Sequence, residues 1–233
     1  MHLFYISNIY GSEITLAETE SKHAVRVLRL KEGSSLNIVD GRGGFYSAEL
    51  TEANPKKCRL AVKSIRKEFG KRNFTIHIAI APTKNIARFE WFLEKATEIG
   101  IDEITPLITQ HSERKNINAD RLQKILISAM KQSQKAYLPK LNELISFNNF
   151  MDRLPGKEKF IAHCNGENKT HLKNKLKKGS DSLVLIGPEG DFSDNEIIKA
   201  LSVGFREISL GSSRLRTETA GVVACHIAAL VNE

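Results

Sequence analysis

The stretch that decides the fold is LVLIGPEGDFS, residues 183–193, where four apolar residues run directly into a Gly-Pro-Glu-Gly turn. A continuous apolar run of this length is typical of a strand buried on both faces of a parallel sheet. Gly187 and Gly190 permit backbone angles and close approaches that a Cβ atom would block. The following residues 193–196, SDNE, fit a capping box that begins a helix. The pattern predicts a ligand-binding loop at the edge of a parallel sheet, with an ordinary strand-to-helix turn as the alternative.

A second glycine loop, LGSSRLRTETAG at residues 210–221, repeats this arrangement. A short strand over 207–210 precedes it, and a helix over 216–231 follows. That helix is apolar nearly all round, so we expect it to be buried. Arg216, Thr217 and Glu218 would then be anchored at the mouth of a rigid element. The alternative for the two charged residues is an exposed pair in the first turn.

Strands and helices alternate from residue 74 onward. The expected strands are 74–81, 103–108, 159–162, 182–186 and 207–210, and the expected helices are 86–99, 119–137, 193–203 and 216–231. Such alternation predicts an α/β fold with a parallel sheet covered by helices.

Residues 1–70 have a different pattern, with short β-type runs over 36–39, 45–50 and 58–65 and one helix around 21–30. They predict a small, mainly β module of barrel type. The charged segment 66–72 is the best candidate linker. We therefore expect two domains, 1–70 and 74–233.

The chain has 233 residues and a net charge of +8, and its basic excess is concentrated at the front. Residues 1–72 contain 13 Lys and Arg against 8 Asp and Glu, whereas the rest contains 22 against 19. This balance favours a partner with a phosphate backbone, with a solvated basic surface as the alternative. The candidate RNA contacts are Arg26, Arg29, Lys56, Lys57, Arg66 and Lys67.

The three cysteines, Cys58, Cys164 and Cys225, are far apart and lack CxxC spacing. A disulfide framework and a zinc site are therefore not expected, and no other metal cluster is visible. No signal peptide and no apolar stretch of membrane-spanning length is recognisable. We expect a cytoplasmic protein.

The absence of known phosphate-binding motifs limits which class of ligand the glycine loops could bind. The GxxxxGK[ST] and GxGxxG phosphate patterns are absent, and Glu189 would repel a triphosphate. A cationic or zwitterionic ligand, such as the sulfonium S-adenosylmethionine, suits the loop better. A third loop, residues 163–167, also follows a strand. In it His163 is either a general base or a structural histidine, and Cys164 is expected to be a buried apolar residue.

Five segments resemble one known family. They are HAVRVLRLKEG (23–33), EKATEIGIDEITPL (94–107), KQSQKAYLP (131–139), IGPEGDFSDNE (186–196) and LGSSRLRTETAG (210–221). Together they resemble the ribosomal RNA small subunit methyltransferase E family of the SPOUT (trefoil-knot) superfamily. The resemblance covers nearly the whole chain, and the last two segments are the most specific.

The resemblance implies a PUA-like RNA-binding domain followed by a SPOUT methyltransferase domain, and it implies a homodimer. The implied reaction is methylation of N3 of a uridine in small-subunit (16S) ribosomal RNA by S-adenosylmethionine, with that RNA or the 30S subunit as partner. There are two alternatives. The chain could be another SPOUT methyltransferase with a different target atom, or a non-catalytic assembly factor that binds RNA.

Carried over by position, the cofactor would lie against three loops. Its expected contacts are His163, Ile186, Gly187, Pro188, Glu189, Gly190, Ile208, Leu210, Gly211, Ser213, Leu215, Arg216 and Thr217. Arg216 would stabilise negative charge on the uracil carbonyls, and Glu218 or a water would take the N3 proton.

Overall fold

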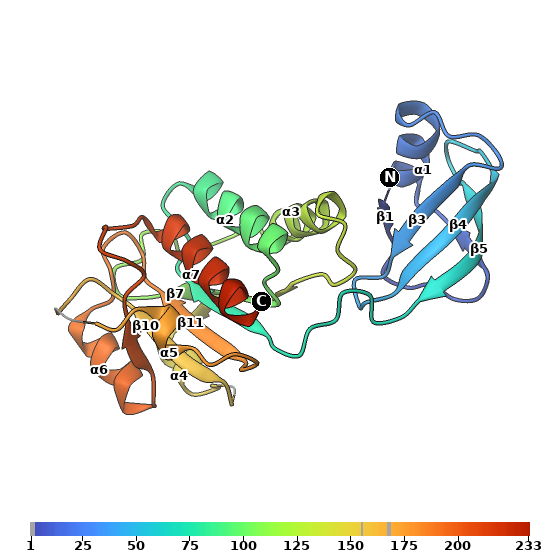
Figure 1. Cartoon of the computed structure of the whole chain (residues 1–233). Coiled ribbons are helices and arrows are strands. Elements are labelled where there is room, and N and C mark those ends of the chain that lie inside the picture. The colour runs from blue at the N-terminus through green and yellow to red at the C-terminus, as the bar shows by residue number, and fades with distance from the viewer. Residues whose placement is uncertain (1–2, 155, 167–168) are drawn as a thin grey trace. The chain divides into compact units, whose positions relative to one another are not determined.

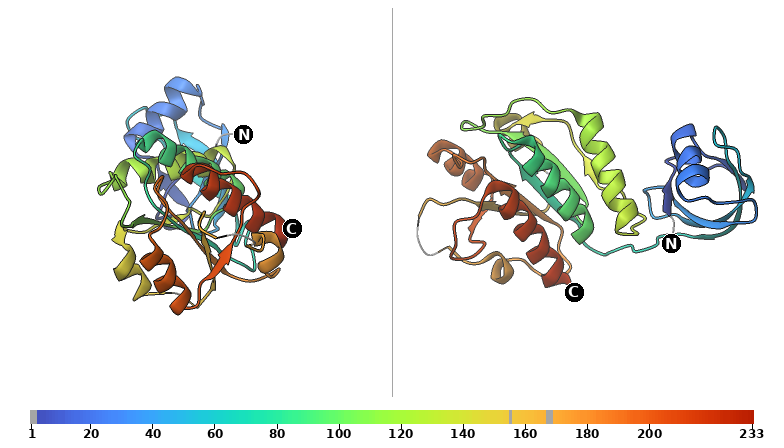
Figure 2. Two further views of the ribbon diagram at one scale, coloured as in Figure 1. Left: turned by 90° about the vertical axis from the view of Figure 1, so that its left-hand side faces the viewer. Right: turned by 90° about the horizontal axis from the view of Figure 1, so that it is seen from above.

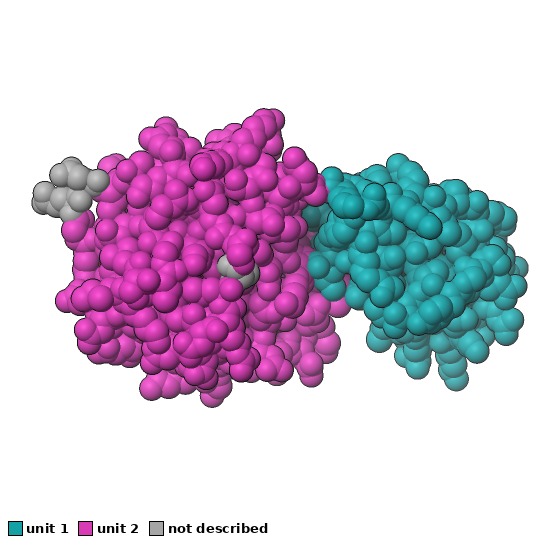
Figure 3. Space-filling view, turned by 90° about the horizontal axis from the view of Figure 1, so that it is seen from below, with its two compact units in different colours: residues 1–71, 130–138 teal, residues 72–129, 139–233 magenta. Residues whose placement is uncertain are grey.

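The computed structural model describes residues 3–154, 156–166 and 169–233, and the chain forms two compact units. One unit consists of residues 1–71 and 130–138, and the other of residues 72–129 and 139–233 (Figure 3). Among the described helices, none is long and apolar enough to cross a membrane.

The N-terminal unit is built on a curled five-stranded sheet with the order β1-β3-β4-β5-β2. Its strands are β1 (Leu3–Tyr5), β2 (Glu13–Thr15), β3 (Ser35–Val39), β4 (Phe45–Glu52) and β5 (Arg59–Arg66). The β1–β3 pairing is parallel and the others are antiparallel. Buried apolar side chains from all five strands fill one core.

The expected helix around 21–30 is in fact two shorter pieces, α1 (Glu18–Lys22) and the π-helix η1 (His23–Val27). The wider turn is visible where the amide of Leu28 donates to the carbonyl of His23, five residues earlier. Arg29 then takes a left-handed conformation, with φ of 54°, and ends the helical run. Insertions of this kind are invisible to a periodicity of 3.6 residues.

The helix α3 (Ala119–Gln132) is shorter than the expected 119–137. Gln134 has φ of 56°, which breaks the helix. The segment that follows belongs to the N-terminal unit, where Met130 and Ala136 are buried against Val39 and Phe45. Sequence reasoning missed this packing, because contacts between distant segments leave no local periodicity.

The second unit contains a seven-stranded sheet in which every pairing is parallel, as predicted. Its order is β12 (Arg206–Ile208), β10 (Glu158–Ala162), β11 (Ser182–Ile186), β6 (Ile76–Ile80), β7 (Glu103–Ile108) and β8 (Lys140–Leu141), and β9 (Ile145–Ser146) also pairs with β7. Every residue of the central strands β6 and β11 is buried. The apolar run in 183–186 thus forms the middle of the sheet.

Helices cover both faces of this sheet (Figures 1 and 2). On one face α2 (Ile86–Ile99) packs against α7 (Thr217–Asn232), and on the other lie α4 (Phe147–Met151) and α6 (Asp194–Ser202). A short helix, α5 (Leu172–Lys175), contacts α7. The expected capping box at the start of α6 is present, with Ser193 and Glu196 as its two members. These helices fix the loops at the carboxyl edge of the sheet.

Candidate cofactor and catalytic site

Three predicted loops meet at the carboxyl edge of the sheet. The strands β12, β10 and β11 are direct neighbours, and Ala162 at the end of β10 is in register with Ile186 on one side and Ile208 on the other. The loops that follow these strands therefore leave the sheet at one level, side by side. In open α/β sheets this edge is where ligands bind.

The second loop, residues 187–193, needs its glycines for close packing. A Cβ atom on Gly187 would lie 3.1 Å from the Phe192 ring, and one on Gly190 would lie 3.0 Å from Cβ of His111. Neither glycine has a positive φ. We infer that close approach, rather than unusual backbone angles, explains both glycines.

The same loop is held by the loops that follow β6 and β7, which sequence reasoning missed. Glu189 accepts a hydrogen bond at 3.0 Å from the amide of Lys84. Arg114 donates to the carbonyls of Thr83 and Lys84, at 3.0 and 2.7 Å. These contacts draw two further loops to the candidate site and leave Glu189 a fixed negative charge at its rim.

Asp191 joins the first loop to the second. Its carboxylate accepts hydrogen bonds from the amides of Cys164, at 2.7 Å, and Phe192, at 2.8 Å. The residue has φ of 62°, in the left-handed region that a non-glycine side chain disfavours. Strain of this kind persists where the surrounding contacts determine the conformation, often at functional sites. No local sequence signal pointed to this role.

His163 is a neutral, enclosed histidine. Only 1% of its side chain is exposed, and Nε2 lies 2.8 Å from a carboxylate oxygen of Glu207, to which it donates. Burial, followed by the nearby charge of Lys169, lowers the pKa of His163. Within the described ranges, its Nδ1 atom has no hydrogen-bond partner. The ring therefore presents one buried acceptor to a ligand N–H or O–H group.

Cys164 is exposed, contrary to the expectation of a buried apolar residue. Burial of the thiol itself and the adjacent Asp191 carboxylate raise its pKa. A raised pKa keeps the sulfur protonated, so the residue is unsuited to nucleophilic catalysis. In the part of the chain that is described, no group of three His, Cys, Asp or Glu side chains could hold a metal ion.

The third loop, residues 209–216, is anchored on the chain that follows the first loop. The amide of Ser209 donates to the carbonyl of Thr170, and the amide of Leu172 donates to the carbonyl of Ser209. Gly211 has φ of 138°, and a Cβ atom there would meet open space. Its glycine is required by the backbone conformation, and the loop leaves free volume above it.

Arg216 and Glu218 stand at the start of α7 in different environments. Arg216 is the N-cap residue and is exposed, whereas Thr217 and Glu218 are buried, with 5% and 7% exposure. Arg88 of α2 approaches Glu218, with Nε 3.9 Å from Oε1. The amino terminus of a helix also favours a carboxylate. The exposed guanidinium is free to meet a ligand, while Glu218 is held behind the surface.

The remaining predicted cofactor residues line the same edge. Ile186, Pro188 and Ile208 are buried, Leu210 and Leu215 are half-buried, and Ser213 is exposed. Only Glu167 of the first loop lies outside the described residues.

The candidate RNA contacts form two groups in the N-terminal unit. Arg26 and Arg29 are exposed at η1, and Lys56 and Lys57 are exposed in the turn before β5. The hydrogen bond from the amide of Cys58 to Ser21 brings these two segments together. We call these four cations the η1 group.

The other two cations follow the far end of β5. That strand has eight residues, about 25 Å at the rise of a strand. The Arg66 guanidinium stacks over the rings of Phe45 and Phe69, 4.5 Å from each centroid. Lys67 is exposed beside it. The structure therefore does not bring the six predicted cations into one patch.

Comparisons with known proteins agree with this geometry. A family model described as an RNA methyltransferase domain matches residues 70–229, and one described as an RNA methyltransferase PUA domain matches residues 16–63. Ribosomal RNA small subunit methyltransferase E of Synechocystis sp. is 30% identical over 222 residues, which cover 93% of this chain and 72% of that protein. The chain belongs to the ribosomal RNA small subunit methyltransferase E family.

Solved structures show the same likeness across both units. A probable rRNA methyltransferase from Porphyromonas gingivalis is 43% identical with a TM-score of 0.91, covering 97% of this chain and 95% of that one. The methyltransferase E of Neisseria gonorrhoeae, crystallised with S-adenosylmethionine, is 26% identical with a TM-score of 0.85, covering 97% and 95%. The predicted fold class, a SPOUT-type α/β domain preceded by a PUA-like domain, is confirmed.

Proposed function

We propose that this chain methylates N3 of a uridine in small-subunit (16S) ribosomal RNA, with S-adenosylmethionine as the methyl donor. The observation that carries the proposal is the meeting of three loops at the ends of β12, β10 and β11. The family relationship supports the reaction class, and the exposed Arg216 beside these loops supplies a group for the target base.

The donor set fits this cofactor. In the loops after β11 and β12, the carbonyls of Ile186, Pro188, Gly190 and Gly211 are already bonded within the protein. Among the described residues, the backbone groups of Gly187, Glu189, Leu210 and Ser213 are left for a ligand, together with a buried acceptor on His163 and the carboxylate of Glu189 at the rim. Backbone groups and a neutral acceptor can hold an adenosine, and a nearby carboxylate favours a positively charged sulfur. When bound, the cofactor supplies a methyl group on a good leaving system. The protein's task is then mainly to position the two reactants.

The target nitrogen must lose a proton before it can attack. Negative charge then spreads onto the two neighbouring carbonyl oxygens, and the exposed fork of Arg216 donates to them. Glu218 takes the proton, directly or through a water. Its burial and its closeness to Arg88 hold the carboxylate in place at the start of α7.

The N-terminal unit supplies affinity for RNA. Within the described residues, Arg26, Arg29, Lys56 and Lys57 have no carboxylate partner, so the η1 group is free to track phosphates. Arg66 is already engaged with two aromatic rings. The η1 group is therefore the stronger candidate for phosphate contacts.

A second copy of the chain covers the outer face of α2 and α7. The helix α7 was expected to be buried all round, yet Leu230 is 56% exposed, and Trp91 of the neighbouring α2 is 43% exposed. Exposed large apolar residues on two adjacent helices are typical of an interface, and most soluble oligomers are assembled from identical chains. The charge-introducing variant Leu230→Glu should shift the sedimentation coefficient from dimer to monomer. A wild-type protein that already sediments as a monomer would refute this assignment.

The domain bounds 1–70 and 74–233 and the cytoplasmic location are carried over from the sequence pattern, and the trefoil knot is carried over from the family resemblance. They belong to the same proposal, in which the partner is the RNA itself or the 30S subunit.

The test of the reaction is methyl transfer from labelled S-adenosylmethionine to small-subunit particles taken from cells that lack the protein. The wild type should label the RNA, and Gly211→Val should not, because its left-handed backbone excludes a β-branched residue. Label in protein only, or none at all with folded enzyme, would refute the proposed function.

A further inference from the structure

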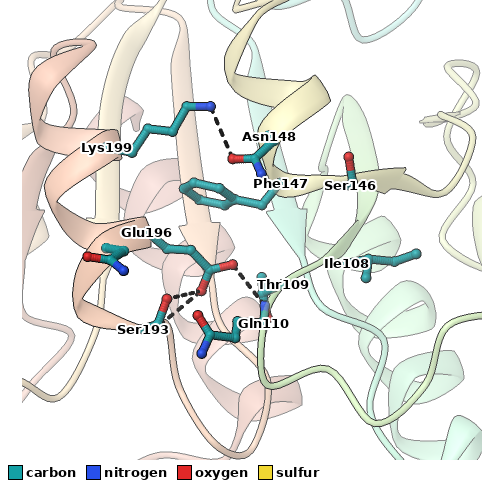
Figure 4. Close-up of a pocket in the computed structure, with 10 residues that line it drawn as sticks. Ile108, Thr109, Gln110, Ser146, Phe147, Asn148, Ser193, Glu196 and Lys199 are labelled. Carbon is teal, nitrogen blue, oxygen red and sulfur yellow. Dashed lines mark hydrogen bonds between the residues drawn. The ribbon is translucent and has the colours of Figure 1, made fainter.

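A cavity of about 350 Å³ lies at the carboxyl edge of the sheet on the side of α4 and α6 (Figure 4). The end of β7, the start of α4 and the first turns of α6 enclose it. The residues that matter for its chemistry are Gln110, Phe147, Asn148, Asn195, Glu196 and Lys199. Its volume is in the range of ligand sites.

The wall of this cavity is built rigidly. One carboxylate oxygen of Glu196 accepts from the amide and hydroxyl of Ser193, at 2.9 and 3.0 Å, and the other accepts from the amide of Gln110 at 2.8 Å. Figure 4 shows this carboxylate joining α6 to the loop after β7. Because three donors occupy it, Glu196 shapes the cavity and is not free to bind a cation.

Most of the polar side-chain groups of the cavity that remain free for a ligand are amides. The side chains of Gln110 and Asn195 are exposed and make no hydrogen bond among the described residues. Lys199 donates to the amide oxygen of Asn148 at 3.0 Å, which leaves the amide NH₂ group of Asn148 unused. The cavity thus presents paired donors and acceptors, one cation, and the buried Phe147 ring below them.

These amide groups, the lysine and the aromatic ring have the chemistry needed to bind a single nucleotide. Amide side chains offer a donor and an acceptor together, as the edges of nucleobases require, and a lysine neutralises a phosphate. The site also adjoins the proposed catalytic loops. His111, next to Gln110, donates through Nδ1 to the carbonyls of Gly190 and Asp191, at 3.0 and 3.1 Å.

We propose that this cavity binds one nucleotide of the ribosomal RNA strand close to the methylated uridine. The inference rests on the proposed function, because it assumes that RNA is the substrate. The cavity would fix the register of the strand, so that one uridine rather than its neighbours reaches the cofactor. Its residues position the substrate and take no part in the chemical step.

The test uses the full-length double variant Gln110→Ala, Asn195→Ala. The backbone amide of Gln110 that bonds Glu196 remains, and alanine suits a helix, so the fold should persist. The matched control is Asn174→Ala, an exposed amide on α5 outside the cavity that makes no side-chain bond among the described residues. Calorimetry with S-adenosylmethionine should give the same affinity for all three proteins.

With small-subunit particles as the probe, KM of the double variant should rise about tenfold or more, while kcat changes less than twofold. The control should behave like the wild type. An unchanged KM in the double variant would overturn the cavity assignment while the wild-type activity upholds the proposed function. A wild type that binds cofactor but never methylates RNA would overturn both.

Discussion

Replacing Asp191 by glycine tests whether the first two loops are coupled as the structure indicates. The residue has a left-handed backbone with φ of 62°, and its carboxylate bonds the amides of Cys164 and Phe192. Glycine accepts this backbone conformation without strain but has no carboxylate. The variant therefore separates the effect of backbone strain at residue 191 from the effect of the hydrogen bonds that link the two loops.

The magnitudes predict a small effect on the stability of the fold and a large effect on cofactor binding. Left-handed backbone costs a non-glycine residue about 1–2 kcal/mol, which glycine recovers. The two lost hydrogen bonds are worth about 1 kcal/mol each at this half-exposed position, so the free energy of unfolding should change by less than about 1 kcal/mol. Ordering one or two freed residues of the first loop on binding costs about 1–2 kcal/mol each. The total of about 1–4 kcal/mol means that cofactor affinity should fall by about 5- to 1,000-fold.

Calorimetry with S-adenosylmethionine and thermal unfolding measure the two quantities. Asp191→Asn is the matched control, because asparagine tolerates the left-handed conformation and retains one acceptor oxygen, and it should lie between wild type and Asp191→Gly. It should also speed alkylation of Cys164, because the charge that raises the pKa of that thiol is gone. If Asp191→Gly binds the cofactor as tightly as wild type, the link between the loops has no role in binding.

Three further outcomes are expected. Burial lowers the pKa of His77 to about 4, so between pH 6.5 and 4 this residue gains a proton only in the unfolded state. The free energy of unfolding should therefore be constant above pH 6.5 and fall by about 2 kcal/mol by pH 5. Urea titrations of the wild type that give the same free energy of unfolding at both pH values would contradict this. Arg216→Lys should lose about 10²-fold in single-turnover methylation while calorimetry shows little change in cofactor affinity, and a wild-type rate would exclude a catalytic role. Replacing Lys56 and Lys57 by glutamine should lower the salt slope of RNA binding by about 2, whereas Lys67→Gln should lower it less; equal slopes for wild type and the double variant would mean that the η1 group only solvates the surface.

The central architecture could be predicted because its signals are local. The expected bounds of β7, β11 and α2 coincide with those observed, since an unbroken apolar run and an amphipathic helix ended by Gly100 are readable in one window. The three loops could be placed together because parallel strands end at one edge. Their order, with β10 between β12 and β11, is a long-range property that the sequence pattern does not contain.

The site residues that the sequence did not predict were missed for a common physical reason, which is that they act through contacts between distant segments. Lys84, His111 and Arg114 act on the site from the loops that follow β6 and β7. Each makes a hydrogen bond that has a backbone amide or carbonyl as one partner, and no motif records such bonds. Asp191 was within the quoted motif, yet its left-handed backbone and its bond to the first loop appear only in three dimensions. The split of the basic residues between the two ends of β5 follows from strand length, which the charge count ignored.

The most direct test of the central claim is mass spectrometry of small-subunit ribosomal RNA from cells with and without this protein. RNA from wild-type cells should contain one N3-methyluridine that is missing when the gene is deleted. The mark should return when the wild-type protein, but not Gly211→Val, is supplied. The same methylated uridine in both RNAs, or the loss of a methyl group from a different atom, would contradict the account.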